Sequence, residues 1–286
     1  MTVEREALKK EKKLEGLLQE LNGALVASSG GVDSTYLLYK AAAVLGRDRV
    51  LAVTADTPLR PPEEAAAAAE TAAALGVRHR VIQTAELSRE DFCANPPDRC
   101  YYCKCELLAL LSQIAGAEGL PHLLDGSNRD DAGDYRPGAR AAREWGVRSP
   151  LQEAGLSKEE IRLLSRYHGL PTWDKPAAAC LASRFPYGER LEPEKLKQVE
   201  QGERFLRSLG LQKEVRVRRH GTVARIEVTP GELELIMNHR CAVVDRFKQL
   251  GFLYVTLDLE GFQSGSMNRV LQNNKEAGSV GEETGG

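Results

Sequence analysis

The chain has 286 residues, a length that allows one large domain or two domains of ordinary size. Its 42% hydrophobic and 28% charged residues are typical of a soluble globular protein. The 39 basic and 41 acidic side chains give a net charge of −2, which argues against a dedicated surface for tRNA or DNA.

The N-terminal segment MTVEREALKKEKKLEGLLQEL is charged and helical in pattern, without an apolar signal region. No stretch of the chain approaches the roughly 18 consecutive apolar residues of a membrane helix. We therefore expect a cytoplasmic protein without a membrane partner. In that compartment the six cysteines are expected to be thiols, metal ligands or catalysts, and not disulfides.

Strand and helix signals alternate along the first half of the chain. Four short runs predict strands, at residues 24–27, 50–56, 78–84 and 122–126. Pro61 and Pro62 begin an alanine-rich segment that is typical of a helix and runs to Gly76. This alternation predicts an α/β domain with a parallel sheet covered on both faces, and we place it at residues 1–185.

The string SSGGVDST at residues 28–35 follows the first predicted strand. Gly30 and Gly31 let the backbone approach a bulky anion, and a helix that opens at Asp33 offers free N–H groups to a phosphate chain. The alternative is a tight turn in which Asp33 or Ser34 caps the helix. The complete string SGGVDST resembles the pyrophosphate-binding loop (PP-loop) of the ATP pyrophosphatases, which cut ATP between its α and β phosphates.

Polar residues follow three of the predicted strands, within 28–33, 54–56 and 125–128. Ligands of parallel sheets bind at the carboxyl ends of the strands, so we expect these three segments to meet at one edge. The residues that we expect to bind ATP there are Ser28, Ser29, Gly30, Gly31, Asp33, Ser34, Thr54, Asp56, Asp125 and Gly126.

Cysteines form the second candidate site. Cys100 and Cys103 have the C-x-x-C spacing that suits one metal centre, although a redox-active, structural or incidental pair has the same spacing. Cys105 is either a spare ligand or a packing residue ahead of an apolar helix. Cys180 lies among small residues, where the charge of Arg184 would favour a thiolate; the alternative is a small buried cysteine.

The remaining two thiols, Cys93 and Cys241, lie in apolar helical contexts and are expected in the core. Beyond Pro186 the pattern changes to a helix at 193–209, alternating strands at 214–218 and 224–228, and a strand at 253–259. We expect a smaller α+β domain at residues 186–272. The polar, Gly-rich tail at 273–286 is expected to be disordered.

The alternating strands are joined through His220 and Gly221, which predicts a hairpin. If the valines and isoleucine face the core, then Arg216 and Arg218 share the outer face, where two guanidinium groups suit phosphate or carboxylate. The alternative is a solvated face with weak pairs such as Arg216 with Glu227.

Several longer strings resemble the ATP-dependent sulfur transferases of the LarE type, from about residue 20 to residue 270. They are SGGVDSTYL, DGSNRDD, RSPLQEAGLSKEEIR, LPTWDKPAAACLASRFPYGERL and VTLDLEGFQSGSMN. The resemblance implies synthesis of the nickel-pincer nucleotide used by lactate racemase. A carboxylate of pyridinium-3,5-biscarboxylic acid mononucleotide is adenylated by ATP with Mg²⁺, and sulfur then displaces AMP to give a thiocarboxylate.

Some members of this family sacrifice the sulfur of a single cysteine, at the position of Cys180. Others carry a [4Fe-4S] cluster on three thiolates, at positions that match Cys100, Cys103 and Cys180, and the fourth iron binds sulfide for delivery. The C-x-x-C favours the cluster; a sacrificial Cys180 and a zinc site remain alternatives. Arg184, Arg216 and Arg218 are the candidates for binding substrate anions, and Glu227 is a guess for Mg²⁺. The family tends toward homo-oligomers.

Other classes of nucleotide-binding protein share the glycine loop or the clustered cysteines. A PP-loop tRNA thiolase would have the loop and three cysteines, but the net charge, the lack of an RNA-binding appendage and the string CLASRFPYG argue against it. A synthetase of NAD or GMP would have no use for three clustered thiols. A non-catalytic sensor of nucleotide and redox state would bind without releasing pyrophosphate.

Overall fold

The computed structural model describes residues 3–133, 137–176, 179–263 and 265–269. The chain divides into two compact units, Met1–Ala178 and Ala179–Gly286, so the division precedes the expected boundary at residue 185. The tail at 273–286, for which we expect disorder, lies outside the described residues. No helix in the described part of the chain is both long enough and apolar enough to span a bilayer.

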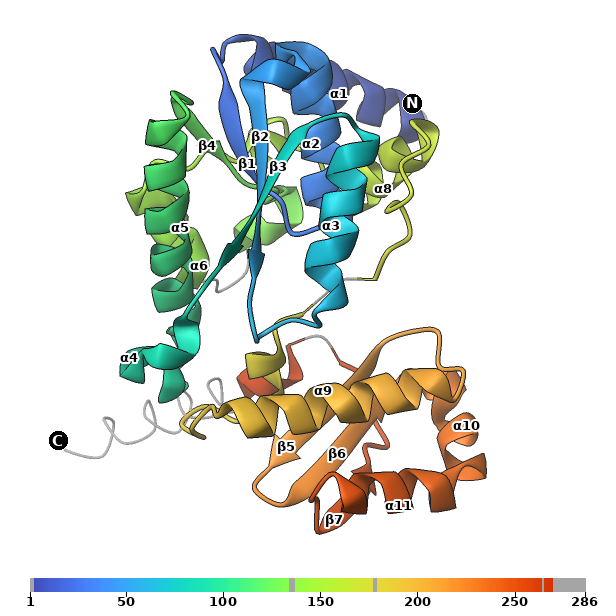
Figure 1. Cartoon of the computed structure of the whole chain (residues 1–286). Helices are drawn as coiled ribbons and strands as arrows, with labels where there is room; N and C mark the ends of the chain where they lie inside the picture. The colour runs from blue at the N-terminus through green and yellow to red at the C-terminus, as the bar shows by residue number, and fades with distance from the viewer. Residues whose placement is uncertain (1–2, 134–136, 177–178, 264, 270–286) are drawn as a thin grey trace, which may run out of the picture. The chain divides into compact units, whose positions relative to one another are not determined.

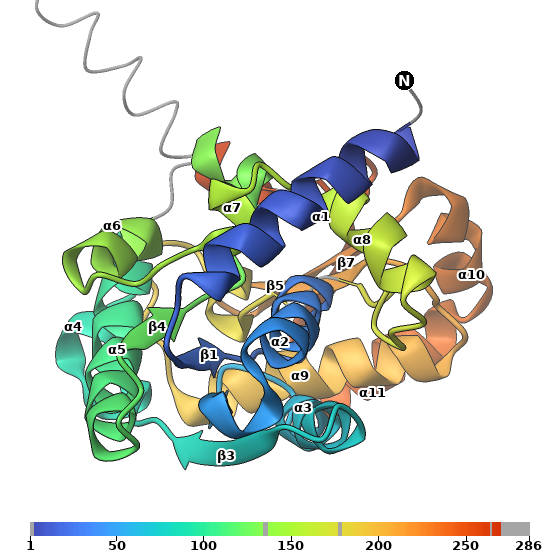
Figure 2. The same cartoon turned by 90° about the horizontal axis from the view of Figure 1, so that it is seen from above.

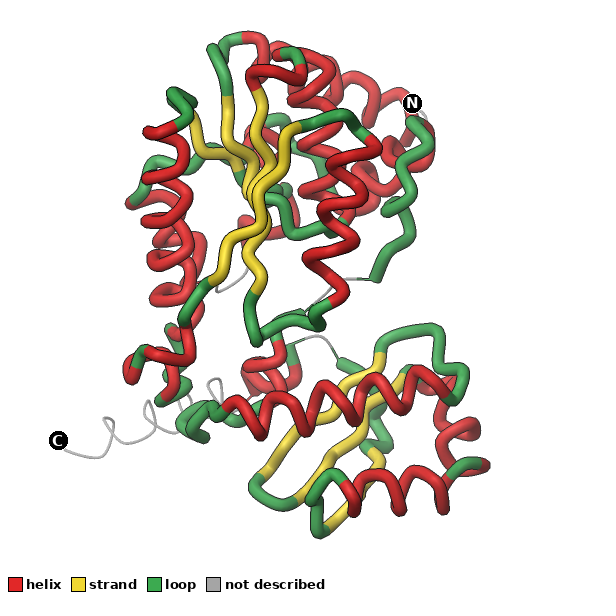
Figure 3. Tube along the Cα trace, in the orientation of Figure 1, coloured by secondary structure: helices red, strands yellow, loops and turns green. Residues whose placement is uncertain are grey.

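A parallel four-stranded sheet forms the centre of the first unit (Figures 1 and 3). Its strands lie in the order β3-β2-β1-β4, with the bounds β1 Ala24–Ala27, β2 Val50–Asp56, β3 Arg78–Gln83 and β4 His122–Leu124. β1 pairs with β2 from Ala24 opposite Val50, and with β4 from Ala24 opposite His122. The prediction of a parallel α/β sheet is confirmed.

Helices cover both faces of this sheet, as Figures 1 and 2 show. The helices of the unit are α1 Val3–Gln19, α2 Val32–Leu45, α3 Glu63–Ala74, α4 Glu90–Cys93, α5 Arg99–Ala117, α6 Pro137–Glu144, α7 Pro150–Glu153 and α8 Lys158–Tyr167. Along β1 successive side chains enter different cores: Val26 packs with α1, α2 and α8, and Leu25 packs with α5 and α6. Both faces are therefore buried, as the apolar strands require.

The second unit is an α+β fold with a three-stranded sheet in the order β5-β6-β7. Its elements are α9 Pro193–Ser208, β5 Val215–His220, β6 Val223–Val228, α10 Leu233–Asn238, α11 Arg240–Gln249 and β7 Tyr254–Leu257. β5 and β6 form the expected hairpin, with Val217 opposite Ile226, and Gly221 turns the chain with φ +59°. β7 pairs parallel to β6.

The core of this unit lies between the sheet and its helices. Val217 of β5 and Phe247 of α11 are fully buried. A Cβ at Gly202 of α9 would lie 3.2 Å from the Phe247 ring and 3.5 Å from Val217, so glycine permits this close packing. One expectation is wrong: Cys241 is exposed on α11 and not part of the core. The buried side of α11 is instead formed by Val243 and Phe247.

Candidate functional site

The PP-loop connects β1 to α2. Ser28 N donates to Val53 O at 2.9 Å, which extends the sheet pairing past β1, and Gly30 then adopts φ +69°. A Cβ at Gly30 would lie 3.1 Å from the Cβ of Ala68 on α3. Such a φ and such a close approach favour glycine at this position. The loop therefore turns tightly enough to present its backbone at the start of α2.

α2 begins at Val32, and its N-cap Gly31 makes no side-chain capping bond. Neither Asp33 nor Ser34 is the cap, so the alternative of an ordinary capped turn is wrong. Ser34 Oγ instead accepts from Ser29 N at 3.2 Å and donates to Gly31 O at 3.2 Å. This hydroxyl fixes the shape of the loop, and the first N–H groups of a helix, which lack partners within the helix, favour an anion there.

The three predicted strand ends meet at this loop. Thr54 Oγ1 donates to Ser28 O at 2.7 Å, which ties the end of β2 to the loop. On the other side, a Cβ at Gly126 would lie 2.9 Å from Ser34 N, so the segment after β4 touches the start of α2. The order β3-β2-β1-β4 reverses direction at β1, and parallel sheets bind ligands at such a crevice. Asp56 closes β2 and accepts from Gln83 Nε2 at 2.7 Å.

Positive side chains that sequence analysis did not identify surround the loop. Lys175 Nζ donates to Gly30 O at 3.1 Å, and Arg60 Nη1 donates to Ser29 O at 3.4 Å. Both come from loops distant in sequence, so no local pattern could reveal them. They add positive charge beside a backbone that already favours anions.

Asp33 is the carboxylate of the loop. It forms an ion pair with Lys158, the first residue of α8, while its Oδ1 is buried without a hydrogen-bond partner in the described residues. Burial raises the pKa of Asp33 above its ordinary value, although Lys158 opposes the rise. A buried oxygen without a partner is a suitable ligand for a cation such as Mg²⁺.

Asp125, after β4, is buried, and both of its carboxylate oxygens accept hydrogen bonds. Its Oδ2 lies 3.0 Å from Lys104 Nζ, and Oδ1 accepts from Ser149 Oγ at 2.7 Å and from Ser127 N at 3.2 Å. Burial alone would raise the pKa of Asp125, but the charge of Lys104 and these hydrogen bonds lower it. Lys104 follows Cys103, so the ion pair ties the cysteine helix α5 to the nucleotide edge of the sheet.

Cys100 and Cys103 lie on the first turns of α5. Their spacing places them on one face of the helix near its N-terminus, where the dipole favours thiolates. Cys100 is exposed and Cys103 is partly buried, with its Sγ donating to Glu86 Oε1 at 3.7 Å. Cys105 packs against the apolar core between α5 and the sheet, as the packing alternative predicts. Cys93 is buried, as expected.

Cys180 belongs to the second unit, just before the short 3-10 turn η4, Leu181–Arg184. The three candidate ligands are therefore divided between the units. Within the described ranges, no three His, Cys, Asp or Glu side chains gather closely enough to share a metal ion. The described residues thus place Cys100 and Cys103 on one face of α5, and a ligand set that also includes Cys180 stays a prediction.

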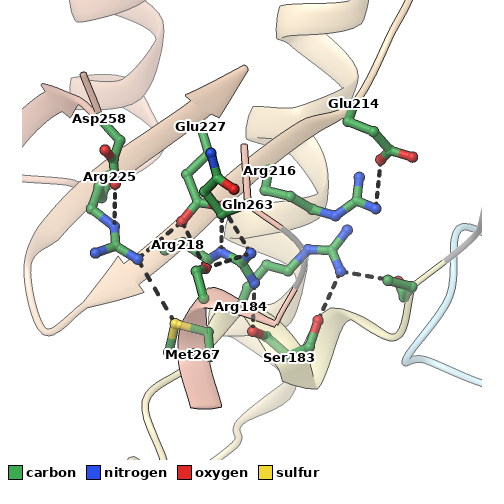
Figure 4. Close-up of polar contacts among 12 residues, drawn as sticks. Ser183, Arg184, Glu214, Arg216, Arg218, Arg225, Glu227, Asp258, Gln263 and Met267 are labelled. Atoms are coloured by element: carbon green, nitrogen blue, oxygen red, sulfur yellow. Dashed lines mark hydrogen bonds and ion pairs between the residues drawn. The ribbon is translucent and has the colours of Figure 1, made fainter. Parts of the chain in front are cut away.

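Arg216 and Arg218 lie on one face of the β5–β6 hairpin, which we call the arginine face. Arg216 and Arg218 are each only 5% exposed, so the alternative of a solvated face is wrong, while their binding of substrate anions stays a prediction. Arg218 binds Glu227 through Nε at 3.0 Å and Nη2 at 2.8 Å, and its Nη1 donates to Ser183 O at 2.9 Å (Figure 4). Segments from outside the hairpin, η4 and Ser266, cover this face.

Arg216 stands opposite Glu227 in the strand register, but it does not pair with it. Its Nη2 lies 2.7 Å from Glu214, and its guanidinium lies 5.1 Å from the centre of the Phe262 ring. Burial, reinforced by the positive charge of Arg184, lowers the pKa of Arg216. Arg216 is thus buried between the carboxylate of Glu214 and the ring of Phe262, and its binding of a substrate anion stays a prediction.

Glu227 does not fit the Mg²⁺ role that was guessed for it. The side chain is 1% exposed, and its two oxygens bind Arg218 at 2.8 Å and Arg225 at 2.9 Å (Figure 4). Two guanidinium groups already balance its charge, so a divalent cation would have to approach against them. The guess is corrected: Glu227 orders the arginine face.

Comparison with known proteins identifies relatives over most of the chain. The asparagine synthase family profile matches residues 26–112. An uncharacterized protein of Synechocystis sp. is 49% identical over 266 residues, 91% of this chain and 98% of that protein. The pyridinium-3,5-bisthiocarboxylic acid mononucleotide synthase of Lactiplantibacillus plantarum is 43% identical over 256 residues, 89% of this chain and 92% of that protein.

A further relative matches a smaller part of the chain. Argininosuccinate synthase of Halobacterium salinarum is 33% identical over 144 residues, 47% of this chain and 36% of that protein. The L. plantarum match covers 89% of the chain and so extends through both units. The chain therefore belongs to the family of that synthase, the ATP-dependent sulfur transferases of the LarE type within the PP-loop ATP pyrophosphatases.

Proposed function

We propose that this enzyme adenylates a carboxylate of pyridinium-3,5-biscarboxylic acid mononucleotide and converts it to a thiocarboxylate during synthesis of the nickel-pincer nucleotide of lactate racemase. The name of the L. plantarum relative, a pyridinium-3,5-bisthiocarboxylic acid mononucleotide synthase, supports the substrate class. The observation that carries the proposal is the glycine loop at the crevice between β1 and β4, where Gly126 closely approaches Ser34. The family resemblance further supports a cytoplasmic homo-oligomer.

The first step needs a leaving group because a carboxylate is a poor electrophile. A substrate carboxylate oxygen attacks the α-phosphorus of ATP, the bond from that phosphorus to the bridging oxygen breaks, and pyrophosphate leaves. The N–H groups of residues 30–33 would stabilise the departing negative charge, and Lys175, which also pairs with Glu64 at 2.8 Å, would assist them. Asp33 would hold Mg²⁺ through its unpartnered Oδ1, and the cation would neutralise phosphate charge.

The second step exchanges oxygen for sulfur. A sulfide sulfur attacks the carbonyl carbon of the acyl adenylate, the carbon–oxygen bond to AMP breaks, and thiocarboxylate and AMP result. Cys100, Cys103 and Cys180 would hold a [4Fe-4S] cluster, which when bound offers an open iron for sulfide without consuming the protein. The partly exposed pair on α5 fits such a group. Arg216 is the residue that we propose to bind a substrate anion.

The cluster is tested by anaerobic purification with an iron count and an absorption spectrum. We expect iron in the wild-type protein and its loss in Cys100→Ala, Cys103→Ala and Cys180→Ala, since each removes one of three ligands. Cys241→Ala is the matched control, because this exposed thiol lies outside the proposed set and should leave iron unchanged. Absence of iron throughout, with activity lost only in Cys180→Ala, would establish the sacrificial mechanism instead.

A further inference from the structure

A buried carboxylate on α9 connects two segments of the second unit. Glu203 Oε1 accepts from Arg184 Nε at 2.7 Å and from Val217 N at 3.1 Å, and its Oε2 accepts from Arg184 Nη2 at 2.9 Å. Burial alone would raise the pKa of Glu203, but the charge of Arg184 lowers it, so the carboxylate stays ionised. One side chain thus joins η4, which follows Cys180, to β5.

The guanidinium held by Glu203 also holds the backbone around Cys180. Arg184 Nη1 donates to the carbonyl oxygens of Ala179 and Cys180, both at 3.1 Å, and to Ser183 Oγ at 2.9 Å (Figure 4). From β5, Arg218 reaches the carbonyl of Ser183. The carbonyl groups of the turn at 179–183 are therefore bonded to buried, charged donors, which are stronger than neutral ones.

These bonds correct the expectation for Arg184. Its Nε, Nη1 and Nη2 all bind groups of its own unit, and the side chain is 3% exposed. A guanidinium has a fixed fork of five N–H donors, and here the fork is directed at protein atoms. Arg184 therefore does not present a free face to a substrate carboxylate or phosphate.

We propose that Glu203 and Arg184 are positioning residues for Cys180. This inference rests on the proposed role of Cys180 in sulfur transfer. Glu203 fixes the plane of the guanidinium, and that plane directs Nη1 at the carbonyls beside the thiol. Through Val217 the same carboxylate fixes β5, whose neighbouring residue Arg216 is the proposed anion site. The thiol and the anion site thereby share one anchor.

The bonds of Glu203 are expected to matter more for the position of Cys180 than for the stability of the fold. A buried ion pair often adds little stability over apolar packing, because desolvation opposes the attraction. A misplacement of about 1 Å in a reacting group, however, can lower a rate about 100-fold. The pair is therefore expected to affect the chemical step more than nucleotide binding, which the loop of the first unit performs.

Glu203→Gln is the direct test, because it keeps the shape and removes the charge. We expect kcat for thiocarboxylate formation to fall about 10- to 100-fold, while the KM for ATP changes less than about threefold. Hydrogen exchange of the wild-type and variant proteins reports the turn itself. The peptide covering 179–185 should exchange at least about tenfold faster, with α10 and α11 unchanged. Glu203→Asp, which keeps the charge, should restore part of the protection.

Glu189→Gln is the matched control. Glu189 pairs with Arg219 on the same strand β5 and accepts from Gly221 N at 3.4 Å, contacts at the hairpin turn and not at the turn 179–183, so both kcat and exchange should stay at wild-type values. Wild-type kcat and exchange in Glu203→Gln would overturn the proposal. A uniform rise of exchange throughout the second unit would overturn it too, since Glu203 would then serve the whole unit.

Cys180→Ala, assayed in parallel, separates this inference from the proposed function. If Cys180→Ala retains thiocarboxylate formation, the role of Cys180 fails. The exchange result for Glu203→Gln still decides whether the carboxylate orders the turn. If Cys180→Ala is inactive and Glu203→Gln is fully active with an ordered turn, only the positioning role fails.

Discussion

At the scale of single residues, the site depends on charged pairs between distant segments. Lys158 pairs with Asp33 and Lys104 with Asp125. Sequence analysis identified both carboxylates because each follows a strand, a position that the α/β pattern predicts. It could not identify the lysines, because a long flexible side chain reaches its partner from an unrelated element and leaves no local spacing.

Burial of the ionised Asp33 carboxylate lowers the stability of the folded protein, and we attribute its presence to the proposed role in binding a cation. Its pKa is raised above the ordinary value of 3.8, so its charged form is less favourable in the folded protein than in the unfolded chain. The penalty is absent at pH values below both pKa values and grows as the pH rises through them. Functional sites often keep such unfavourable groups.

Asp33→Asn is therefore expected to raise the urea midpoint of unfolding at pH 7, and this gain should shrink as the pH falls through the raised pKa of Asp33 and vanish below both pKa values. Substrate-dependent pyrophosphate release should fall at least about tenfold, because a cation ligand is lost. Asp48→Asn, at an exposed position in the 3-10 turn Arg47–Arg49, is the control and should change neither quantity. A lower midpoint at pH 7 would show that the pairing with Lys158 outweighs the burial penalty.

At the scale of elements, hydrophobic periodicity predicted the strands and the hairpin well. Val215, Val217, Ile226 and Val228 are buried on one face, as their alternation predicts. The same alternation could not tell whether the arginine face is covered. That depends on Ser183 and Ser266, which lie far from the hairpin in sequence. In the same way, the apolar residues around Cys241 could not show which side of helix α11 is exposed to solvent, and Cys241 lies on that side.

Helix α8 shows how a local signal supports the site. Ser157 accepts from Glu160 N at 3.2 Å, and the Glu160 carboxylate accepts from Ser157 N at 2.9 Å, which forms a capping box. This cap fixes the start of the helix, where Lys158 pairs with Asp33. Glu160 also binds Lys10 of α1 at 2.6 Å.

Ser157→Ala should lower the free energy of unfolding by about 1 kcal/mol, because the backbone N–H of Glu160 in the first turn of α8 loses its side-chain partner. Urea unfolding followed by circular dichroism measures this loss. Ser208→Ala, at the exposed end of α9, is the control and should change the stability by less than about 0.5 kcal/mol. An equal loss in both variants would contradict a specific role for the cap.

At the scale of the whole molecule, the chemistry is divided between two units. The first unit supplies the glycine loop, Asp33, which we propose to bind a cation, and the Cys100–Cys103 pair, and the second supplies Cys180 and the arginine face. Sequence strings identified these parts because each part has a local motif, but the expected boundary at residue 185 placed Cys180 in the first domain, whereas the structure places it in the second unit. The anchoring of Cys180 by Glu203 has no such motif, since one buried carboxylate joins residues from three elements.

The central claim is that adenylation and sulfur transfer are separate steps that use separate parts of the chain. The most direct test is to measure pyrophosphate and thiocarboxylate in the same anaerobic reaction of Cys180→Ala with ATP and the pyridinium dicarboxylate nucleotide. We predict substrate-dependent pyrophosphate release within about threefold of wild type, with thiocarboxylate reduced at least about 100-fold. Thiocarboxylate formation at the wild-type rate in this variant would contradict the account.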